Sequence, residues 1–384
     1  MNGSLTLAAL VLRHPTAWRV LSKWESSLLS KRLAATTIDR PVFISGLARA
    51  GTTILLRKLC ELPEFAAHRY SDFPFLFTPY AWALLRRLAP ASRQIPRERM
   101  HKDGIMVTAE SPEAMEEVLW MAFFPHLHDP AKSNNLDDRI QRPEFEFFFA
   151  DHIRKLILAR GGQRYISKNN YNLTRLSYLS RIFPDARFLL PIRAPVSHVA
   201  SLMKQHELFC QVQHENEAAR QHLHLAGHFE FGLDRRPINP GDHDAVAAIE
   251  ACWKRHEEAR GWARYWALMY HQMAERLEAD AELARRCLLV RYEDLCDRAL
   301  ETMAAVGEHI GLPAQGAERL AAGLHRPDYY TVQLTDDERA AIREETAAVA
   351  RRFGYSADGA RNPAGNSIAS TLFSWNAIRD SRSE

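Results

Sequence analysis

The chain has 384 residues, 46% of them hydrophobic and 25% charged, which is the balance of an ordinary globular protein with a sizeable core. Its length suits one large α/β domain or two domains of ordinary size. The net charge of +3 suits an anionic small ligand, but it is too weak to indicate nucleic-acid binding.

The cysteine pattern and the hydropathy favour a cytoplasmic protein. The five cysteines are scattered and form no CxxC pair, which argues against a disulfide framework or a zinc ribbon. The N-terminal apolar run lacks a basic leader and a small-residue cleavage site, so we do not expect a signal peptide. No run of about 18 apolar residues occurs, so we expect no membrane span.

The first third of the chain combines helices with one compact strand. Residues 1–39 have leucines near helical spacing and predict an N-terminal helical extension. Residues 41–45 (PVFIS) predict a buried strand, and the following helix is expected to begin near Thr52. A second helix is expected at Ser111, an N-cap residue type followed by Pro112 at the first helical position.

Short apolar strands continue to alternate with helices. Strands are predicted at residues 164–168 (RYISK), at 187–193 (RFLLPIR) and within 287–295 (CLLVRYEDL). Helices are predicted after the first two of these strands. This alternation indicates an α/β fold, in which a parallel sheet is covered by helices on both faces.

The remaining segments predict helical insertions and a tail. Residues 206–243 are rich in histidine and are expected to be loop-like. One long helix is predicted to carry three tryptophans, Trp253, Trp262 and Trp266. Residues 357–384 are rich in Gly, Asn, Ser and Ala, which predicts a loosely held C-terminal tail. Without repeats or a Pro/Gly linker, residues 1–384 are predicted to form a single domain.

The stretch GLARAGTT resembles a phosphate-binding loop. Gly46 and Gly51 have the G-x-x-x-x-G spacing, after a predicted strand and at the start of a predicted helix. Such a loop curls so that several N–H groups point toward an anion, and the helix start adds positive potential. The usual lysine is missing; Thr52 and Thr53 follow directly, and the cation is Arg49 inside the loop. A guanidinium offers a planar fork of donors that matches two phosphate or sulfate oxygens.

A second anion site is predicted after the strand at 187–193. Arg193 ends this strand, and Ser201 lies eight residues later, two turns into the next helix. In open parallel sheets, ligands bind at the carboxyl ends of the strands. Arg193 and Ser201 are therefore candidates to hold a further phosphate, although an exposed pair on the surface explains the same pattern.

Together these motifs resemble those of sulfotransferases that use 3′-phosphoadenosine 5′-phosphosulfate. The first family motif, roughly R-S-G-T-T after a strand, is matched by residues 49–53, with Ala50 in place of Ser. The second, R-D-P with a Ser eight positions after the Arg, is matched by residues 193–195 and Ser201. The resemblance spans residues 41–295 and implies a P-loop-like parallel β-sheet.

The resemblance also implies which residues bind the donor. The 5′-phosphosulfate would be held by the loop residues Arg49, Ala50, Gly51, Thr52 and Thr53, and the 3′-phosphate by Arg193 and Ser201. The implied reaction is in-line transfer of a sulfuryl group to a hydroxyl acceptor. Because transfer of this group leaves less charge to neutralise than transfer from a nucleoside triphosphate, no metal is expected.

Sulfuryl transfer to a hydroxyl requires a base. Asp72 and His101 lie near the positions where carboxylate-using and histidine-using branches of the family place theirs, and the sequence does not separate them. Glu110 is a third candidate, although a carboxylate just ahead of a helix is often only a helix-end charge. Lys168 ends a predicted strand and is a candidate to face the donor or the acceptor.

Other sequence features leave the acceptor open. The histidines between residues 206 and 228 lack a neighbouring metal motif, so a polar loop or a lid over the acceptor is favoured. The acceptor is expected to be a small molecule or a glycan with a hydroxyl group, and the oligomeric state is open. Two alternatives remain: a P-loop nucleoside or sugar kinase, and a nucleotide-binding module without activity.

Overall fold

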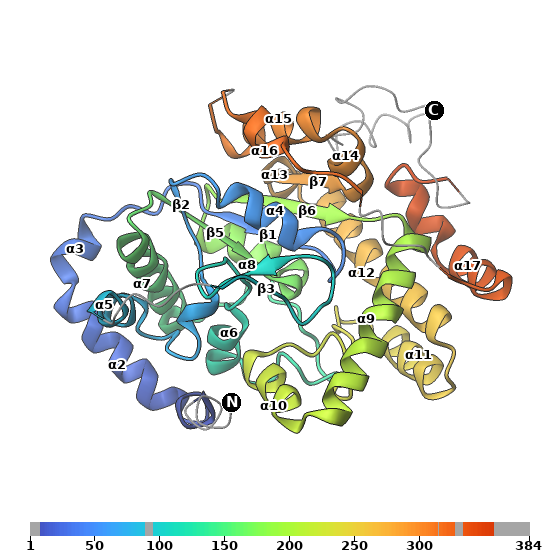
Figure 1. Ribbon diagram of the computed structural model, residues 1–384, viewed down its shortest axis with the longest axis horizontal. Coiled ribbons are helices and arrows are strands. Elements are labelled where there is room, and N and C mark those ends of the chain that lie inside the picture. The colour runs from blue at the N-terminus through green and yellow to red at the C-terminus, as the bar shows by residue number, and fades with distance from the viewer. Residues whose placement is uncertain (1–7, 89–94, 314, 327–332, 357–384) are drawn as a thin grey trace.

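The computed structural model describes residues 8–88, 95–313, 315–326 and 333–356, and its centre is one parallel β-sheet (Figure 1). The strand order is β2-β5-β1-β6-β7. The strand bounds are β1 Val42–Ile44, β2 Phe65–Ala66, β5 Arg164–Lys168, β6 Arg187–Ile192 and β7 Cys287–Arg291. Ile44 at the end of β1 is level with Lys168 on one side and Leu189 on the other, so the loop after β1 emerges between β5 and β6.

Helices cover both faces of this sheet because strand side chains alternate between them. Val42 and Ile44 pack with α4 (Thr52–Leu59), α15 (Ala299–Ile310) and α16 (Ala317–Ala321). Phe43 points the other way, into a cluster with α7 (Pro143–Arg160), α8 (Leu176–Ile182) and α12 (Glu258–Ala279). The predicted α/β class, a parallel sheet flanked by helices, is confirmed.

The other elements surround this three-layer core (Figure 1). The N-terminal segment contains α2 (Pro15–Leu28) and α3 (Ser30–Ala34), which lie beside α7 with α5 (Pro79–Leu88). The remaining elements are η1 Tyr70–Asp72, β3 Arg97–Glu98, β4 Met106–Val107, α6 Glu117–Phe123, η2 Asn170–Thr174, α9 Pro195–Glu215, α10 Glu217–Ala226, α11 His243–Lys254, α13 Ala281–Arg286, α14 Tyr292–Asp297 and α17 Asp336–Arg352. The predicted tail, residues 357–384, lies outside the described residues.

Two predicted elements are wrong in kind or in position. The segment 206–243 is loop-like only over residues 227–242, because α9 continues to Glu215 and α10 covers Glu217–Ala226. Asn216 begins α10, where its side chain accepts a hydrogen bond from the backbone N–H of Ala218. The helix expected at Ser111 begins only at Glu117. Ser111 instead accepts a hydrogen bond from the N–H of Thr108, so its hydroxyl closes a turn.

The predicted long tryptophan helix is two helices, α11 and α12, separated at residues 255–257. His256 has a left-handed backbone conformation with φ 62°, which ends the first helix. None of the helices within the described ranges is both long and apolar enough to cross a bilayer. The five cysteines all lie in described residues, and all have free thiols.

Candidate active site

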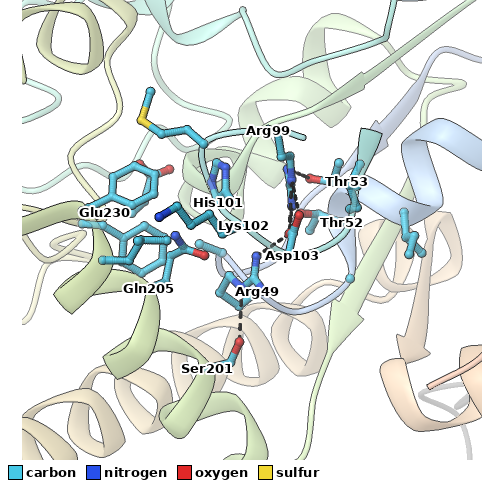
Figure 2. Close-up of a pocket in the computed structure, with 18 of the residues that line it drawn as sticks. Arg49, Thr52, Thr53, Arg99, His101, Lys102, Asp103, Ser201, Gln205 and Glu230 are labelled. Atoms are coloured by element: carbon cyan, nitrogen blue, oxygen red, sulfur yellow. Dashed lines mark hydrogen bonds and ion pairs between the residues drawn. The ribbon is translucent and has the colours of Figure 1, made fainter. Parts of the chain in front are cut away.

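A cavity of about 1250 Å³ opens at the carboxyl end of the sheet (Figure 2). The loop after β1 lines it together with Lys168 at the end of β5 and Arg193 after β6. Its other walls come from the β3–β4 hairpin, α9 and α10. The cavity therefore lies at the edge where ligands of open parallel sheets bind.

Both glycines of the loop are required by close approaches. A Cβ on Gly46 would lie 2.6 Å from the carbonyl oxygen of Pro191 in β6. Gly51 has φ +99°, and a Cβ there would lie 2.9 Å from the ring of Tyr292. The loop thus packs directly on the backbone of β6 and on the Tyr292 ring of α14, and it turns directly into α4.

Arg49 connects the loop to two other elements. Its Nε donates to Ser201 Oγ of α9 at 3.1 Å, and its Nη1 donates to Asp103 Oδ2 of the hairpin at 2.7 Å. Figure 2 shows Asp103 between Arg49 and Arg99, and Arg99 Nε is 2.9 Å from Asp103 Oδ1. Burial by itself raises the pKa of Asp103, but the two arginines outweigh it and hold the pKa well below its ordinary value.

Thr53 joins the loop to the end of β5. Its Oγ1 accepts hydrogen bonds from Lys168 Nζ at 2.8 Å and from Arg99 Nη1 at 3.2 Å. Lys168 also forms an ion pair of 2.9 Å with the buried Glu113. The lysine that the loop lacks in sequence is therefore supplied beside it by the neighbouring strand.

Arg193 lies on the opposite side of the loop. Its guanidinium covers the ring of Tyr292, 4.6 Å from the ring centroid, and its Nε donates to Ser197 Oγ at 3.2 Å. Ser201 is bonded to Arg49 rather than to Arg193. The two predicted anion sites consequently belong to one cavity, which both arginines line.

The segment VRYEDL contacts Ala194, the residue that follows this second arginine. Glu293 accepts a hydrogen bond from the N–H of Ala194 at 3.0 Å, at the start of α9. Arg291 of the same segment is ion-paired with Asp294 at 3.9 Å. Glu293 serves the helix start, where a carboxylate satisfies an N–H group that has no partner within the helix.

Four imidazoles line the cavity, those of His101, His222, His228 and His325. Burial lowers the pKa of His101 well below 6.5, and the nearby cations Arg99 and Arg49 lower it further. Burial also lowers the pKa of His228, but Glu230, whose Oε2 lies 3.7 Å from His228 Nδ1, outweighs burial and raises it. The His101 ring is therefore neutral near neutral pH, whereas the pKa of His228 is shifted in the opposite direction.

Asp72 and Glu110 are placed outside the cavity lining. Asp72 is buried, accepts a hydrogen bond from the N–H of Arg69 and is ion-paired with Arg160 of α7. Glu110 is at the surface in ion pairs with Arg69 and Arg86. Ala50, within the loop, is fully buried and does not line the cavity. His101 and Lys168 both line it. The structure thus distinguishes His101, which lines the cavity, from Asp72, which does not, although the sequence left these two base candidates equivalent.

The cavity residues that were missed at the sequence level include Arg99, Asp103, Glu113 and Tyr292. A signal for the first two exists, because Arg99 and Asp103 flank His101 within the stretch RERMHKD. No periodic or motif signal marks Glu113, since its partner Lys168 is 55 residues away in the chain. Among the described residues, no group of three or more His, Cys, Asp or Glu side chains is placed to hold a metal ion.

Comparison with known proteins agrees with this arrangement. Residues 41–230, which contain the loop, the hairpin, Lys168, Arg193 and most of the cavity wall, match the model of the sulfotransferase family. Residues 41–230 of the chain belong to the sulfotransferase family. This membership favours a sulfotransferase over the kinase alternative for the loop.

Several sulfotransferases are similar over most of their length. Omega-hydroxy-beta-dihydromenaquinone-9 sulfotransferase Stf3, from Mycobacterium bovis and from Mycobacterium tuberculosis, is 24% identical over 354 residues, which cover 87% of this chain and 80% of Stf3. The crystal structure of sulfotransferase STF1 from Mycobacterium tuberculosis aligns with a TM-score of 0.49 and 19% identity, covering 88% of this chain and 84% of that chain. Sulfotransferase STF9 from Mycobacterium avium aligns with a TM-score of 0.47 and 15% identity, covering 86% and 81%.

Proposed function

We propose that this sulfotransferase transfers a sulfuryl group from 3′-phosphoadenosine 5′-phosphosulfate to a hydroxyl acceptor by in-line displacement. The observation that carries the proposal is the pair of arginines, Arg49 and Arg193, on the walls of one cavity at the carboxyl edge of the sheet. A donor with anionic groups at both ends of a nucleoside suits a cavity whose walls carry two arginines, a phosphate-binding loop and a helix start.

The residues on the loop side fit the phosphosulfate. The backbone N–H groups at the start of α4 and the side chains of Arg49 and Lys168 are donors for its oxygens. When bound, the donor supplies the electrophilic sulfur and a phosphate leaving group. As the bond from sulfur to the bridging oxygen breaks, Lys168 and the loop would stabilise the charge that develops on the 5′-phosphate. Arg193 and Ser201 would hold the 3′-phosphate.

We propose His101 as the base. It lines the cavity, and its lowered pKa keeps the ring neutral and able to accept a proton at neutral pH. It would take the proton of the acceptor hydroxyl as that oxygen attacks sulfur. Asp72 is already saturated by Arg160 and the N–H of Arg69, which argues against it.

The acceptor is proposed to be an alcohol or phenol on an apolar body. Beyond the loop, the apolar side chains that line the cavity include Met100, Met115, Leu208, Phe209 and Phe231. These side chains suit an apolar molecule better than an anionic glycan. The similar protein Stf3 is named for an ω-hydroxylated dihydromenaquinone, which is also an apolar molecule with a terminal hydroxyl.

The test combines binding and turnover. Adenosine 3′,5′-bisphosphate without Mg²⁺ should raise the Tm of the protein in a thermal-shift assay, whereas ATP should not. Formation of a sulfated product from the donor and a series of aliphatic alcohols and phenols is then followed by mass spectrometry. Stabilisation by ATP with Mg²⁺ alone would indicate the kinase, and bisphosphate binding without any product would indicate a module without activity.

A further inference from the structure

Helix α2 (Pro15–Leu28) exposes its apolar stripe and buries its polar side. Val20, Trp24 and Leu28 follow one another at intervals of four residues, and all three are exposed, Trp24 at 67% and Leu28 at 87%. A helix that only packs on a core has the opposite orientation, because burial of apolar area is what holds it there. Burial against the core therefore does not explain why the apolar stripe of α2 faces outward.

The orientation of α2 is set by buried polar contacts on its inner side. Lys155 of α7 donates to Ser22 Oγ at 3.0 Å and forms an ion pair of 3.1 Å with Glu25. Trp18 packs inward, with its ring 5.6 Å from that of Phe75. Removing a partner from a buried ion pair is costly, so α2 cannot simply roll over to bury Trp24 and Leu28.

Helix α5 (Pro79–Leu88) extends the same surface. Glu25 of α2 accepts a hydrogen bond from the N–H of Ala81, so α2 and α5 are in contact. The guanidinium of Arg32, in the next helix α3, lies over the ring of Tyr80. α5 also exposes leucines, with Leu84 at 49%. We define the α2–α5 face by the exposed residues Val20, Leu21, Trp24, Leu28, Leu84, Leu85 and Leu88.

The charges on these helices have one sign. α2, α3 and α5 contain six basic residues, Arg19, Lys23, Lys31, Arg32, Arg86 and Arg87. Their one acidic residue, Glu25, is buried against Lys155. The neighbouring acids that face this surface are Glu144, paired with Arg19 and Lys23, and Glu110, paired with Arg86. The surface consequently keeps an excess of positive charge around the exposed apolar side chains.

We propose that the α2–α5 face docks on the surface of an anionic membrane. Exposed leucines with a tryptophan, bordered by lysine and arginine, are the composition of helices that lie in the plane of the bilayer interface. The apolar side chains would enter the boundary between headgroups and acyl chains, while the cations approach the lipid phosphates. Charge complementarity favours this partner over a second copy of the same basic surface, which would be repelled.

The test uses the full chain and lipid vesicles, and it requires neither donor nor acceptor. We expect the protein to co-sediment with vesicles that contain one third phosphatidylglycerol, and to be released by high salt. It should bind vesicles of phosphatidylcholine alone much less. The triple variant Trp24→Ser, Leu28→Ser and Leu84→Ser should lower partitioning by about tenfold or more, because each side chain loses apolar contact.

The matched control is Leu300→Ser. Leu300 is also 49% exposed, but it belongs to α15, far from α2 and α5 in Figure 1, so partitioning should not change. Lys31→Glu with Arg32→Glu should weaken binding only to the anionic vesicles. Absence of binding by the wild-type chain overturns the proposal. So does a dimer in light scattering that the triple variant abolishes, because that result assigns the α2–α5 face to a second copy.

Discussion

Arg49 makes two bonds that an anionic ligand must share or replace. Its guanidinium contacts Ser201 on one side and Asp103 on the other, while its own backbone has φ 72°. The left-handed conformation directs this residue across the loop toward α9 and the hairpin, which a lysine in a standard loop does not do. At the scale of single residues, the affinity for an anionic ligand depends on whether Ser201 or Asp103 releases the Arg49 guanidinium.

Arg49→Ala and Arg193→Ala should each weaken binding of adenosine 3′,5′-bisphosphate by about 10- to 100-fold, because each removes a charge-assisted pair. Isothermal titration calorimetry without Mg²⁺ measures the change. The control is Arg139→Ala, an exposed arginine paired with Asp137, which should leave the affinity unchanged. Unchanged affinity in both site variants would refute the proposed donor orientation.

Asp103→Asn should have opposite effects on affinity and stability. The Asp103 carboxylate neutralises Arg49 and Arg99 and would repel an anionic donor, so its removal should tighten bisphosphate binding several-fold. The same change removes two ion pairs in the protein without ligand and should lower its Tm. Calorimetric affinity and thermal unfolding are measured on one preparation. Weaker binding would show that Asp103 orients the arginines rather than competing for them.

The pH dependence of turnover should identify the base. The pKa of His101 lies below 6.5, lowered by burial and by Arg99 and Arg49 against the weaker opposing effects of Glu113 and Asp103. Its neutral form then persists as pH falls past 6.5, so kcat should decline only well below that pH. A decline already above 6.5 would instead indicate His228, whose pKa is raised.

Variants of the two histidines test the identity of the base in addition to the pH dependence. His101→Ala should lower kcat by about 10²- to 10⁴-fold while bisphosphate affinity stays near the wild-type value. His228→Asn should keep the acid limb of the wild-type profile. Full activity of the His101 variant excludes this base assignment.

At the scale of elements, the loop packs directly on the backbone of β6 and on the Tyr292 ring of α14, so neither of its glycines leaves room for a side chain. Gly46→Ala places a Cβ 2.6 Å from the carbonyl oxygen of Pro191, which is backbone of β6 and cannot move aside cheaply. We expect a loss of about 2 kcal/mol or more in the free energy of unfolding, measured by urea denaturation.

The matched control for this loop glycine is Gly307→Ala. Gly307 lies inside α15, where the nearest atom to a new Cβ is at an ordinary 3.7 Å. This variant should be neutral or more stable by up to about 1 kcal/mol, because alanine favours the helix. Equal destabilisation by the two changes would mean that the close approach to β6 does not limit the loop.

At the scale of the whole molecule, buried ion pairs tie together segments that are distant in sequence. Asp72 joins the chain after β2 to Arg160 at the end of α7, and Glu117 of α6 joins Arg175 before α8. Burial alone raises the pKa of Asp72, but His68 and Arg160 outweigh it and hold the pKa well below 3.8. Such a carboxylate stabilises the fold above its unfolded pKa, and the contribution is lost as pH falls below about 3.8.

Asp72→Asn should therefore destabilise the protein rather than stop the reaction. We expect a loss of about 3–5 kcal/mol at neutral pH and a flatter dependence of Tm on pH in the acid range, because Arg160 is left buried and unpaired. Asp137→Asn, which breaks an exposed pair, should cost no more than about 1 kcal/mol. If an Asp72 variant lost turnover but kept a normal Tm, Asp72 would again be a candidate for the catalytic base.

Local patterns in the sequence were enough to predict the sheet strands that carry the site, the glycine loop with Arg49 inside it, and Arg193 beside the loop. β5 was predicted at its observed bounds because a short run of buried residues ends in a charge, and β1, β6 and β7 because each is a compact apolar run. Such patterns depend on neighbours within a few residues, which is the range that periodicity and turn chemistry describe.

Contacts between distant residues were decided only by the tertiary structure. Lys168 reaches Thr53, and Asp103 reaches Arg49, because parallel strands and a hairpin bring the ends of separate segments to one cavity. Asp72 and His101 are equivalent in sequence, yet packing saturates the first with Arg160 and leaves the second facing the cavity. Local sequence names the groups that can do the chemistry, whereas burial and the partners that folding assigns determine which of them are free to do it.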